Sequence, residues 1–143
     1  MTAGPAAGVR VRYRTEVLAV GAMIPDFRES GLLVFFAEQA PRELHDIVVL
    51  HRPSVAESAP EPGDVFELDG ERFTITAVGS VVAENLLRLG HVSVKADGAV
   101  TAALPGDLNV AKGRLPLPAA GSTMRIVAGG AAEADAEPTE EPS

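Results

Sequence analysis

Residues 66–78 read FELDGERFTITAV, and this stretch predicts a β-hairpin. Its Asp-Gly pair lies between two alternating segments, which is the strongest short-range signal for a two-residue hairpin turn. In the second segment Phe73, Ile75 and Ala77 share one face and polar residues occupy the other, as in a strand with one buried side. The stretch therefore favours an antiparallel, β-rich fold.

Further strands are expected on both sides of the hairpin. Some segments alternate polar and apolar residues, and others are short apolar runs such as LLVFFA and DIVVLH, the second of which is stopped by Pro53. The expected strands lie at 10–17, 32–37, 46–51, 91–96, 109–111 and 124–127. About seven to eight short strands, with no βαβ rhythm, predict an all-β fold, a small closed or partly closed β-barrel.

Two short helical turns are expected between these strands. Residues 41–45 fit a single turn with a proline near its start. Residues 81–89 fit a short helix, with Ser80 as its N-terminal cap and Gly90 just after its last residue. Helices this short leave the strands to define the fold.

Composition excludes several kinds of site. The chain has 143 residues, 46% of them apolar, which suits one domain with its own core. The absence of cysteine excludes a thiol nucleophile, a redox pair, a thiolate zinc site and an iron–sulfur cluster. Its histidines, His45, His51 and His91, show no spacing typical of metal ligands. We therefore expect no metal site and no cofactor.

The charge is unevenly distributed. The formal net charge is −8, but five acidic residues fall in residues 131–143, which leaves an ordinary −3 for the rest. Arginines at 10, 12 and 14 are too few for a nucleic-acid-binding face. No apolar run approaches the ~18 residues of a membrane helix, and the N-terminus lacks the pattern of a signal peptide. A cytoplasmic protein without a nucleic-acid partner is expected.

These patterns divide the chain into three parts. Residues 1–8 are small and punctuated by Pro and Gly, and we expect a flexible leader there. Residues 9–128 form the predicted β-barrel domain. Residues 129–143 have the low hydrophobicity and single-sign charge of a disordered acidic tail.

His51 is the most informative candidate for chemistry. It ends the expected strand 46–51, so a rigid element would hold an imidazole that opens at the rim of the barrel. The adjacent Arg52 could attract an anionic phosphate. The plainer alternative is that His51 merely terminates a strand.

Three other residues are weaker candidates. His91 begins a strand and could hydrogen-bond another imidazole, which would fix the tautomer of that ring; a surface role is the alternative. His45 lies in the short helical turn and is expected at the surface. Ser80 has no identifiable base nearby and lies in no GxSxG motif, so it is a weak nucleophile candidate and is better explained as a helix cap.

Residues 76–94 read TAVGSVVAENLLRLGHVSV, and this segment carries the pattern of a known protein family. This segment resembles the enzyme IIA component of the glucitol/sorbitol-specific phosphotransferase system, whose pattern has Ala-Val-Gly-Ser-Val, Asn-Leu and Leu-Gly-His-Val. The chain has these residues at Ala77–Val81, Asn85–Leu86 and Leu89–Val92. Further matches are Ala40-Pro41, Leu44, the strand 47–51, Asp97-Gly98, Pro105-Gly106, Asn109-Val110 and Gly121-Ser122. The resemblance therefore covers roughly residues 9–128.

The resemblance implies a barrel-like all-β fold and a phosphotransferase with a phosphohistidine intermediate. The family's phosphorylated histidine falls at the end of the strand 47–51, which is His51 here. The implied partners are the phosphocarrier HPr as donor and the IIB and IIC components, with a cysteine of IIB as recipient during uptake of glucitol/sorbitol or a related hexitol. Contact with the membrane would come only through that transporter. His91 as a helper and Arg52 as a phosphate contact are our own inferences.

Two other functions stay open at this point. A non-catalytic β-barrel module could keep the fold for binding or regulation. A small hydrolase could use His51 as a general base, but no nucleophile or carboxylate partner accompanies it. The loop from Ser54 to Gly63 looks longer than in the family, which bears on partner recognition.

Overall fold

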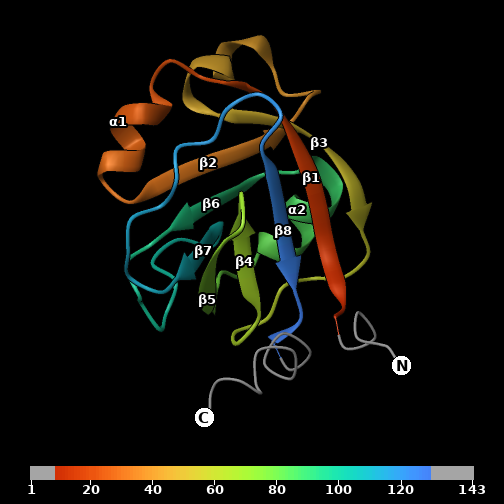
Figure 1. Cartoon of the computed structure of the whole chain (residues 1–143), viewed down its shortest axis with the longest axis vertical. Coiled ribbons are helices and arrows are strands. Elements are labelled where there is room, and N and C mark those ends of the chain that lie inside the picture. Colours follow the sequence, from red (N-terminus) through yellow and green to blue (C-terminus); the bar gives the residue numbers. More distant parts are fainter. Residues whose placement is uncertain (1–8, 130–143) are drawn as a thin grey trace.

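Eight strands close into a barrel in the computed structural model, which describes residues 9–129 (Figure 1). Around the barrel the strand order is β1-β3-β2-β6-β7-β5-β4-β8. The strands are β1 (Val11–Val20), β2 (Leu32–Ala37), β3 (Val49–Ala56), β4 (Val65–Leu68), β5 (Glu71–Val78), β6 (Val92–Lys95), β7 (Asp107–Val110) and β8 (Thr123–Val127). The helices are α1 (Ile24–Glu29), the 3-10 helix η2 (Arg42–Ile47) and α2 (Val82–Leu89). The predicted all-β barrel is confirmed, and its sheet is closed.

The predicted hairpin is formed by β4 and β5. The two strands pair antiparallel, and the turn residues Asp69 and Gly70 have φ values of 50° and 85°, the positive values that a tight two-residue turn requires. The Asp69 carboxylate accepts hydrogen bonds from the Ser122 hydroxyl at 2.7 Å and the Thr123 amide at 3.1 Å. The turn is therefore tied to the start of β8, which pairs with β4.

Two strand pairs are parallel, which the sequence did not predict. β2 pairs parallel with β3, and β6 pairs parallel with β7. The chain crosses from the end of β2 to the start of β3 through η2, the helical turn expected near residues 41–45. A parallel pair needs a crossover connection of about a dozen residues. A single helical turn within a loop does not indicate such a crossover in the sequence.

The course of β3 differs from its prediction. Pro53 was expected to stop this strand, but β3 continues to Ala56. The register between β1 and β3 shifts beside the pair Thr15 and Pro53, and an irregularity of this kind tolerates a proline that cannot donate to the ladder. His51 therefore lies inside a strand and not at its end.

The helices also depart from the expected pattern in places. α1 was not predicted, although it has a proline in its first turn, Asp26 near its start and Arg28 in its last turn. α2 begins at Val82 and ends at Leu89, as expected to within one residue. Gly90 follows it in the left-handed conformation, with φ 67°, and its amide bonds back to carbonyls of the last turn.

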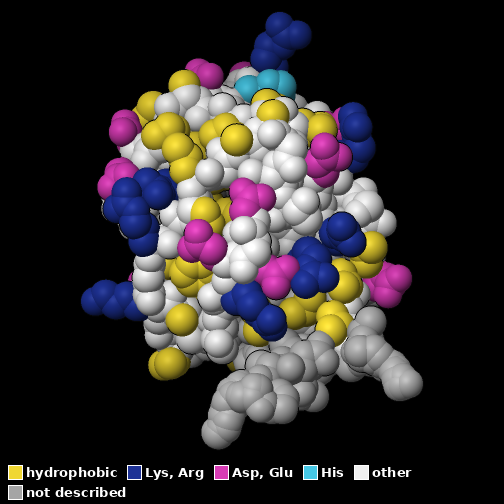
Figure 2. All heavy atoms as spheres, in the orientation of Figure 1, with side chains coloured by type: hydrophobic (Ala, Val, Ile, Leu, Met, Phe, Trp, Pro, Cys, Tyr) yellow, Lys and Arg dark blue, Asp and Glu magenta, His cyan; other side chains and the backbone are white. Residues whose placement is uncertain are grey.

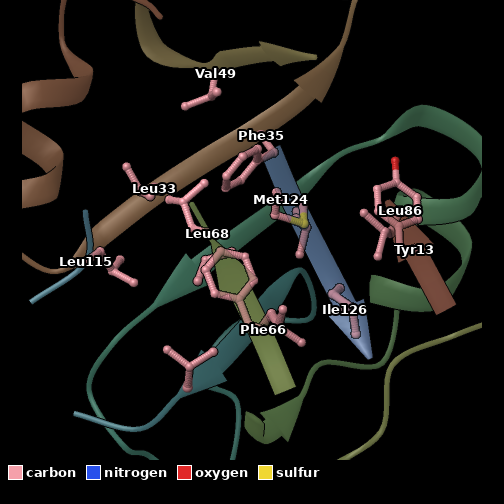
Figure 3. Packing of buried hydrophobic residues seen from close by; sticks show 14 of the residues in the cluster. Tyr13, Leu33, Phe35, Val49, Phe66, Leu68, Leu86, Leu115, Met124 and Ile126 are labelled. Carbon is pink, nitrogen blue, oxygen red and sulfur yellow. The ribbon is translucent and has the colours of Figure 1, made fainter. Parts of the chain in front are cut away.

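The interior of the barrel is filled by apolar side chains, most of them from the strands and others from α1, α2 and the segment before β8 (Figure 3). The large, fully buried residues are Tyr13, Ile24, Leu33, Phe35, Phe66, Leu68, Ile75, Leu86, Leu108, Leu115, Met124 and Ile126. The rings of Phe35 and Phe66 meet edge to face with centroids 6.3 Å apart. This packing is the environment into which the inward residues of β1 and β3 point.

The outer surface carries charges of both signs. On the face drawn in Figure 2, Lys and Arg side chains alternate with Asp and Glu, and neither sign forms a continuous patch. Arg12 bonds to Asp64 at 2.7 Å and to Ser58 at 3.1 Å, and its side chain is only 11% exposed. The N-terminal arginines therefore do not present three free charges on one face. No helix within residues 9–129 is long and apolar enough to cross a membrane.

The expected leader and most of the acidic tail lie outside the described residues. The domain boundaries at 8 and 128 therefore stay predictions.

Candidate functional site

His51 lies on the inward face of β3 and is 0% exposed. The prediction that its imidazole opens at a rim is wrong, because β3 continues past Pro53 and the barrel closes around the ring. The rings of Tyr13 and Phe35 lie in T-shaped arrangements with it, with centroids 6.3 Å and 5.7 Å from the imidazole. The ring is thus enclosed by the aromatic part of the core.

Both ring nitrogens of His51 are hydrogen-bonded. Nδ1 lies 2.6 Å from the Thr15 hydroxyl oxygen, and Nε2 lies 2.7 Å from the Gly90 carbonyl oxygen. A carbonyl only accepts, so in the neutral ring Nε2 carries the proton and donates it to Gly90. Nδ1 then accepts the proton of the Thr15 hydroxyl. Two partners distant in sequence therefore fix the orientation and the tautomer of this imidazole.

The environment keeps His51 uncharged. Burial lowers the pKa of His51 below its usual value near 6.5, and the hydrogen bond to the Gly90 carbonyl opposes this only in part. Burial likewise raises the pKa of Tyr13 far above its ordinary range, so its phenol stays protonated. The Tyr13 hydroxyl is buried and has no hydrogen-bond partner among residues 9–129. The site is a neutral imidazole whose lone pair, on Nδ1, accepts the hydrogen bond of the Thr15 hydroxyl.

Gly90 closes the site at the end of α2. A Cβ on this residue would lie 2.7 Å from Cβ of Ala37 and 2.9 Å from Cε1 of His51, both shorter than real contacts. The positive φ of Gly90 adds a second reason for glycine, because other residues are strained in that conformation. Only glycine lets the backbone approach the imidazole this closely.

His91 lies next to Gly90 and is partly exposed. Its ring stacks on Phe36 with centroids 4.7 Å apart and an angle of 20° between the planes. Burial lowers the pKa of His91, so this imidazole is also neutral at pH 7. We expected that His91 could hydrogen-bond another imidazole. The two ring nitrogens of His51 are instead hydrogen-bonded to Thr15 and to Gly90. The structure thus places His91 beside Gly90, in the segment that covers the imidazole of His51, and not at the ring nitrogens of His51.

Arg52 points away from His51, because successive residues of a strand face opposite sides. Its guanidinium forms a two-point ion pair with Glu38, with both N–O distances 3.0 Å. That hydrogen bond lowers the pKa of the Glu38 carboxyl, and both side chains are exposed. The structure does not bring Arg52 to the imidazole of His51.

Ser80 and His45 lie elsewhere. Ser80 is exposed and precedes α2, whose N-terminal cap position is Val81, and no side chain caps this helix, so the predicted capping role of Ser80 is wrong. Gly90 lies at the other end of α2, a helix roughly 12 Å long at 1.5 Å per residue. His45 lies in η2, and its Nε2 lies 3.1 Å from the carbonyl oxygen of Ala40.

Thr15 is the site residue that the sequence did not single out. The alternation within 10–17 places it on the inward face with Tyr13, but nothing in that pattern indicates an imidazole as its partner. Within the described residues, no group of three His, Asp or Glu side chains is arranged to hold a metal ion.

Residues 12–125 match the model of one protein family, described as the PTS system glucitol/sorbitol-specific IIA component. The chain belongs to this family. The match spans most of the chain and includes both His51 and His91, so the resemblance expected from the sequence is confirmed.

Two relatives of this IIA family member support the assignment. The glucitol/sorbitol-specific EIIA components of Shigella flexneri and of Escherichia coli strain K12 are each 38% identical over 101 residues, covering 71% of this chain and 82% of theirs. A solved structure of a PTS system IIA component from Enterococcus faecalis V583 has the same fold, with a TM-score of 0.69 and 22% identity over 78% of this chain and 96% of that one.

Proposed function

We propose that this chain carries a phosphoryl group on His51, taking it from phosphorylated HPr and passing it to the IIB component. IIB and IIC would then take up and phosphorylate glucitol/sorbitol or a related hexitol. The family match over residues 12–125 is the observation that carries this proposal. The two relatives bear the same glucitol/sorbitol-specific description.

The state of His51 suits a phosphoryl acceptor. A neutral imidazole already holds a lone pair on one of its two nitrogens, so the ring needs no net loss of a proton before it attacks phosphorus. The new N–P bond forms as the N–P bond of the donor breaks, and the donor ring leaves as an imidazole with its lone pair restored. Catalysis in such transfers is mostly positioning and electrostatic stabilisation of the phosphoryl oxygens. Two short hydrogen bonds supply the positioning of His51.

Transfer to a buried ring requires the site to open. Gly90 lies at a helix end between the exposed Leu89 and the partly exposed His91, so the segment that covers Nε2 of His51 borders the surface. The stacking of His91 on Phe36 holds that segment down. We place the docking surface of the partner proteins around this segment, with an interface below about 1,200 Å², as in transient complexes.

The test is a phosphorylation assay with phosphoenolpyruvate, enzyme I and HPr. The full chain should acquire one acid-labile phosphoryl group, which His51→Gln should lose and His45→Ala should keep. Circular dichroism and thermal unfolding of each variant exclude misfolding as the cause of a loss. A label that survives in folded His51→Gln would contradict the site assignment, and its loss in His91→Ala would then move the acceptor to His91.

His91→Ala also tests the helper role. If His91 holds the cover of the site in its productive arrangement, the variant should fold and be phosphorylated more slowly than the wild type. An unchanged rate would remove His91 from the mechanism.

One observation favours a second function, a non-catalytic module that retains the fold. In the closed barrel His51 is 0% exposed and both of its ring nitrogens are occupied. A purely structural histidine has the same features. The assay separates the two functions, because a non-catalytic module would take up no phosphoryl group from the HPr of its own system.

A further inference from the structure

We propose that Thr15 is a positioning residue of the phosphoryl transfer, and that its hydroxyl reverses its hydrogen bond to Nδ1 of His51 so that Nε2 can act as the nucleophile. This inference rests on the proposed function of His51. It assigns a role to the hydroxyl group of Thr15, a residue that is only 1% exposed, and the hydroxyl oxygen lies 2.6 Å from Nδ1 of His51.

The two partners of the imidazole differ in what they can do. The Gly90 carbonyl accepts a hydrogen bond and can never donate one, whereas the Thr15 hydroxyl can do either. In the closed state the proton is on Nε2, and the Thr15 hydroxyl donates to Nδ1. If the proton moves to Nδ1, the Thr15 hydroxyl can keep its hydrogen bond to that nitrogen by becoming the acceptor. The Gly90 carbonyl has no such alternative, because it cannot donate to Nε2.

The two partners also differ in how freely they can move. Thr15 lies within β1, which is paired on one side with β3 and on the other with β8, so its backbone cannot leave without breaking the barrel wall. Gly90 lies in the connection between α2 and β6 and belongs to neither element. The Nε2 edge of the ring is therefore the edge that a local movement uncovers.

Together these facts order the steps. When the Gly90 carbonyl moves away, the proton on Nε2 is exchanged through water, and a proton is taken up on Nδ1, where Thr15 accepts its hydrogen bond. Nε2 then holds the lone pair and attacks phosphorus, while the N–P bond of the donor breaks and the donor ring keeps its electron pair. The product is His51 phosphorylated on Nε2, with the Nδ1 proton held by Thr15.

The experiment compares Thr15→Val with Thr15→Ser. Valine keeps the shape of threonine and removes the hydroxyl, whereas serine keeps the hydroxyl and removes the methyl group. Thr15→Val should slow phosphorylation on the order of 10–100-fold, by analogy with metal-binding histidines that lose the hydrogen-bond partner that orients them. Thr15→Ser should stay within about threefold of the wild type. Equal losses in both variants would overturn the proposal, because packing would then explain them.

Nitrogen NMR of ¹⁵N-labelled protein gives readouts that a structural role would not move. In the unphosphorylated wild type the proton should lie on Nε2, and in Thr15→Val the Nδ1 signal should move downfield because its lone pair has lost a hydrogen bond. In the phosphoprotein, ³¹P–¹⁵N coupling should place phosphorus on Nε2. Phosphorus on Nδ1 would overturn the proposal even if Thr15→Val failed to fold.

These readouts also separate this inference from the proposed function. If the wild type takes up no phosphoryl group, the proposed function fails and the positioning role falls with it, whatever the tautomer. If the wild type is phosphorylated on His51 but Thr15→Val reacts at the same rate, only the role of Thr15 is refuted.

Discussion

Replacing Gly90 by alanine measures how tightly the end of α2 is packed over His51. The φ of Gly90 is 67°, and an L-residue in this left-handed conformation costs about 1–2 kcal/mol. The new Cβ would also lie 2.7 Å from Cβ of Ala37 and 2.9 Å from Cε1 of His51. Overpacking of this kind costs about 1–3 kcal/mol. We therefore expect Gly90→Ala to lower the free energy of unfolding by about 2–5 kcal/mol.

Gly98→Ala is the matched control. Gly98 has a φ of 68°, nearly the value of Gly90, but a Cβ there would meet only Lys112 atoms at 3.5 Å and 3.7 Å, which are ordinary contacts. It should therefore show the conformational cost alone, about 1–2 kcal/mol. Replacing glycine by alanine also lowers the conformational entropy of the unfolded chain, which stabilises the folded protein. This gain is the same for both substitutions, so it cancels in the comparison.

Urea unfolding followed by circular dichroism provides the two free energies. The difference between the variants should be about 1–3 kcal/mol, with Gly90→Ala the less stable. Equal destabilisation of the two variants would refute the reasoning, because it would show that the Gly90 segment is not packed against Ala37 and His51.

Two further predictions concern His51 and Ser80. Because burial lowers the pKa of His51 in the folded state, its neutral form stabilises the protein fully above the unfolded value near 6.5, and this stability is lost as the pH falls below it. The loss is at most about 1.4 kcal/mol per pH unit for one proton. The free energy of unfolding should therefore fall more steeply between about pH 7.5 and 5 in the wild type than in His51→Gln. If the two proteins gave parallel curves of unfolding free energy against pH, this would contradict a buried neutral imidazole. Ser80→Ala should change the free energy of unfolding by less than about 0.5 kcal/mol, because no side chain caps α2, whereas a loss near 1 kcal/mol would reveal a capping bond.

Local patterns in the sequence determined much of the fold. The Asp-Gly turn of the β4–β5 hairpin, the inward face of β5 and the glycine cap of α2 all follow from a few neighbouring residues. Each signal is strong because the turn, the alternation or the cap is satisfied within its own segment. The family resemblance was likewise visible in an ordered series of short motifs.

Two features that the local patterns did not predict correctly depend on contacts between distant segments. Pro53 was expected to end β3, but a proline is tolerated where the register with β1 shifts, and that register is a property of two strands. The parallel pairing of β2 with β3 also lies outside any local pattern, because alternation and apolar runs carry no strand direction. Because of these two features, His51 lies in the interior of the barrel and not at its rim, where we had expected it.

The sequence by itself therefore determined the strands, the barrel and the family, and it singled out His51. Only the tertiary structure decided what surrounds that imidazole. Its two hydrogen-bond partners, Thr15 and Gly90, are 36 and 39 residues away along the chain. They meet the ring because the barrel closes and α2 ends over it. The physical reason is that periodicity is set by neighbouring residues, whereas the tautomer and charge of a buried imidazole are set by whatever the closed fold places against it.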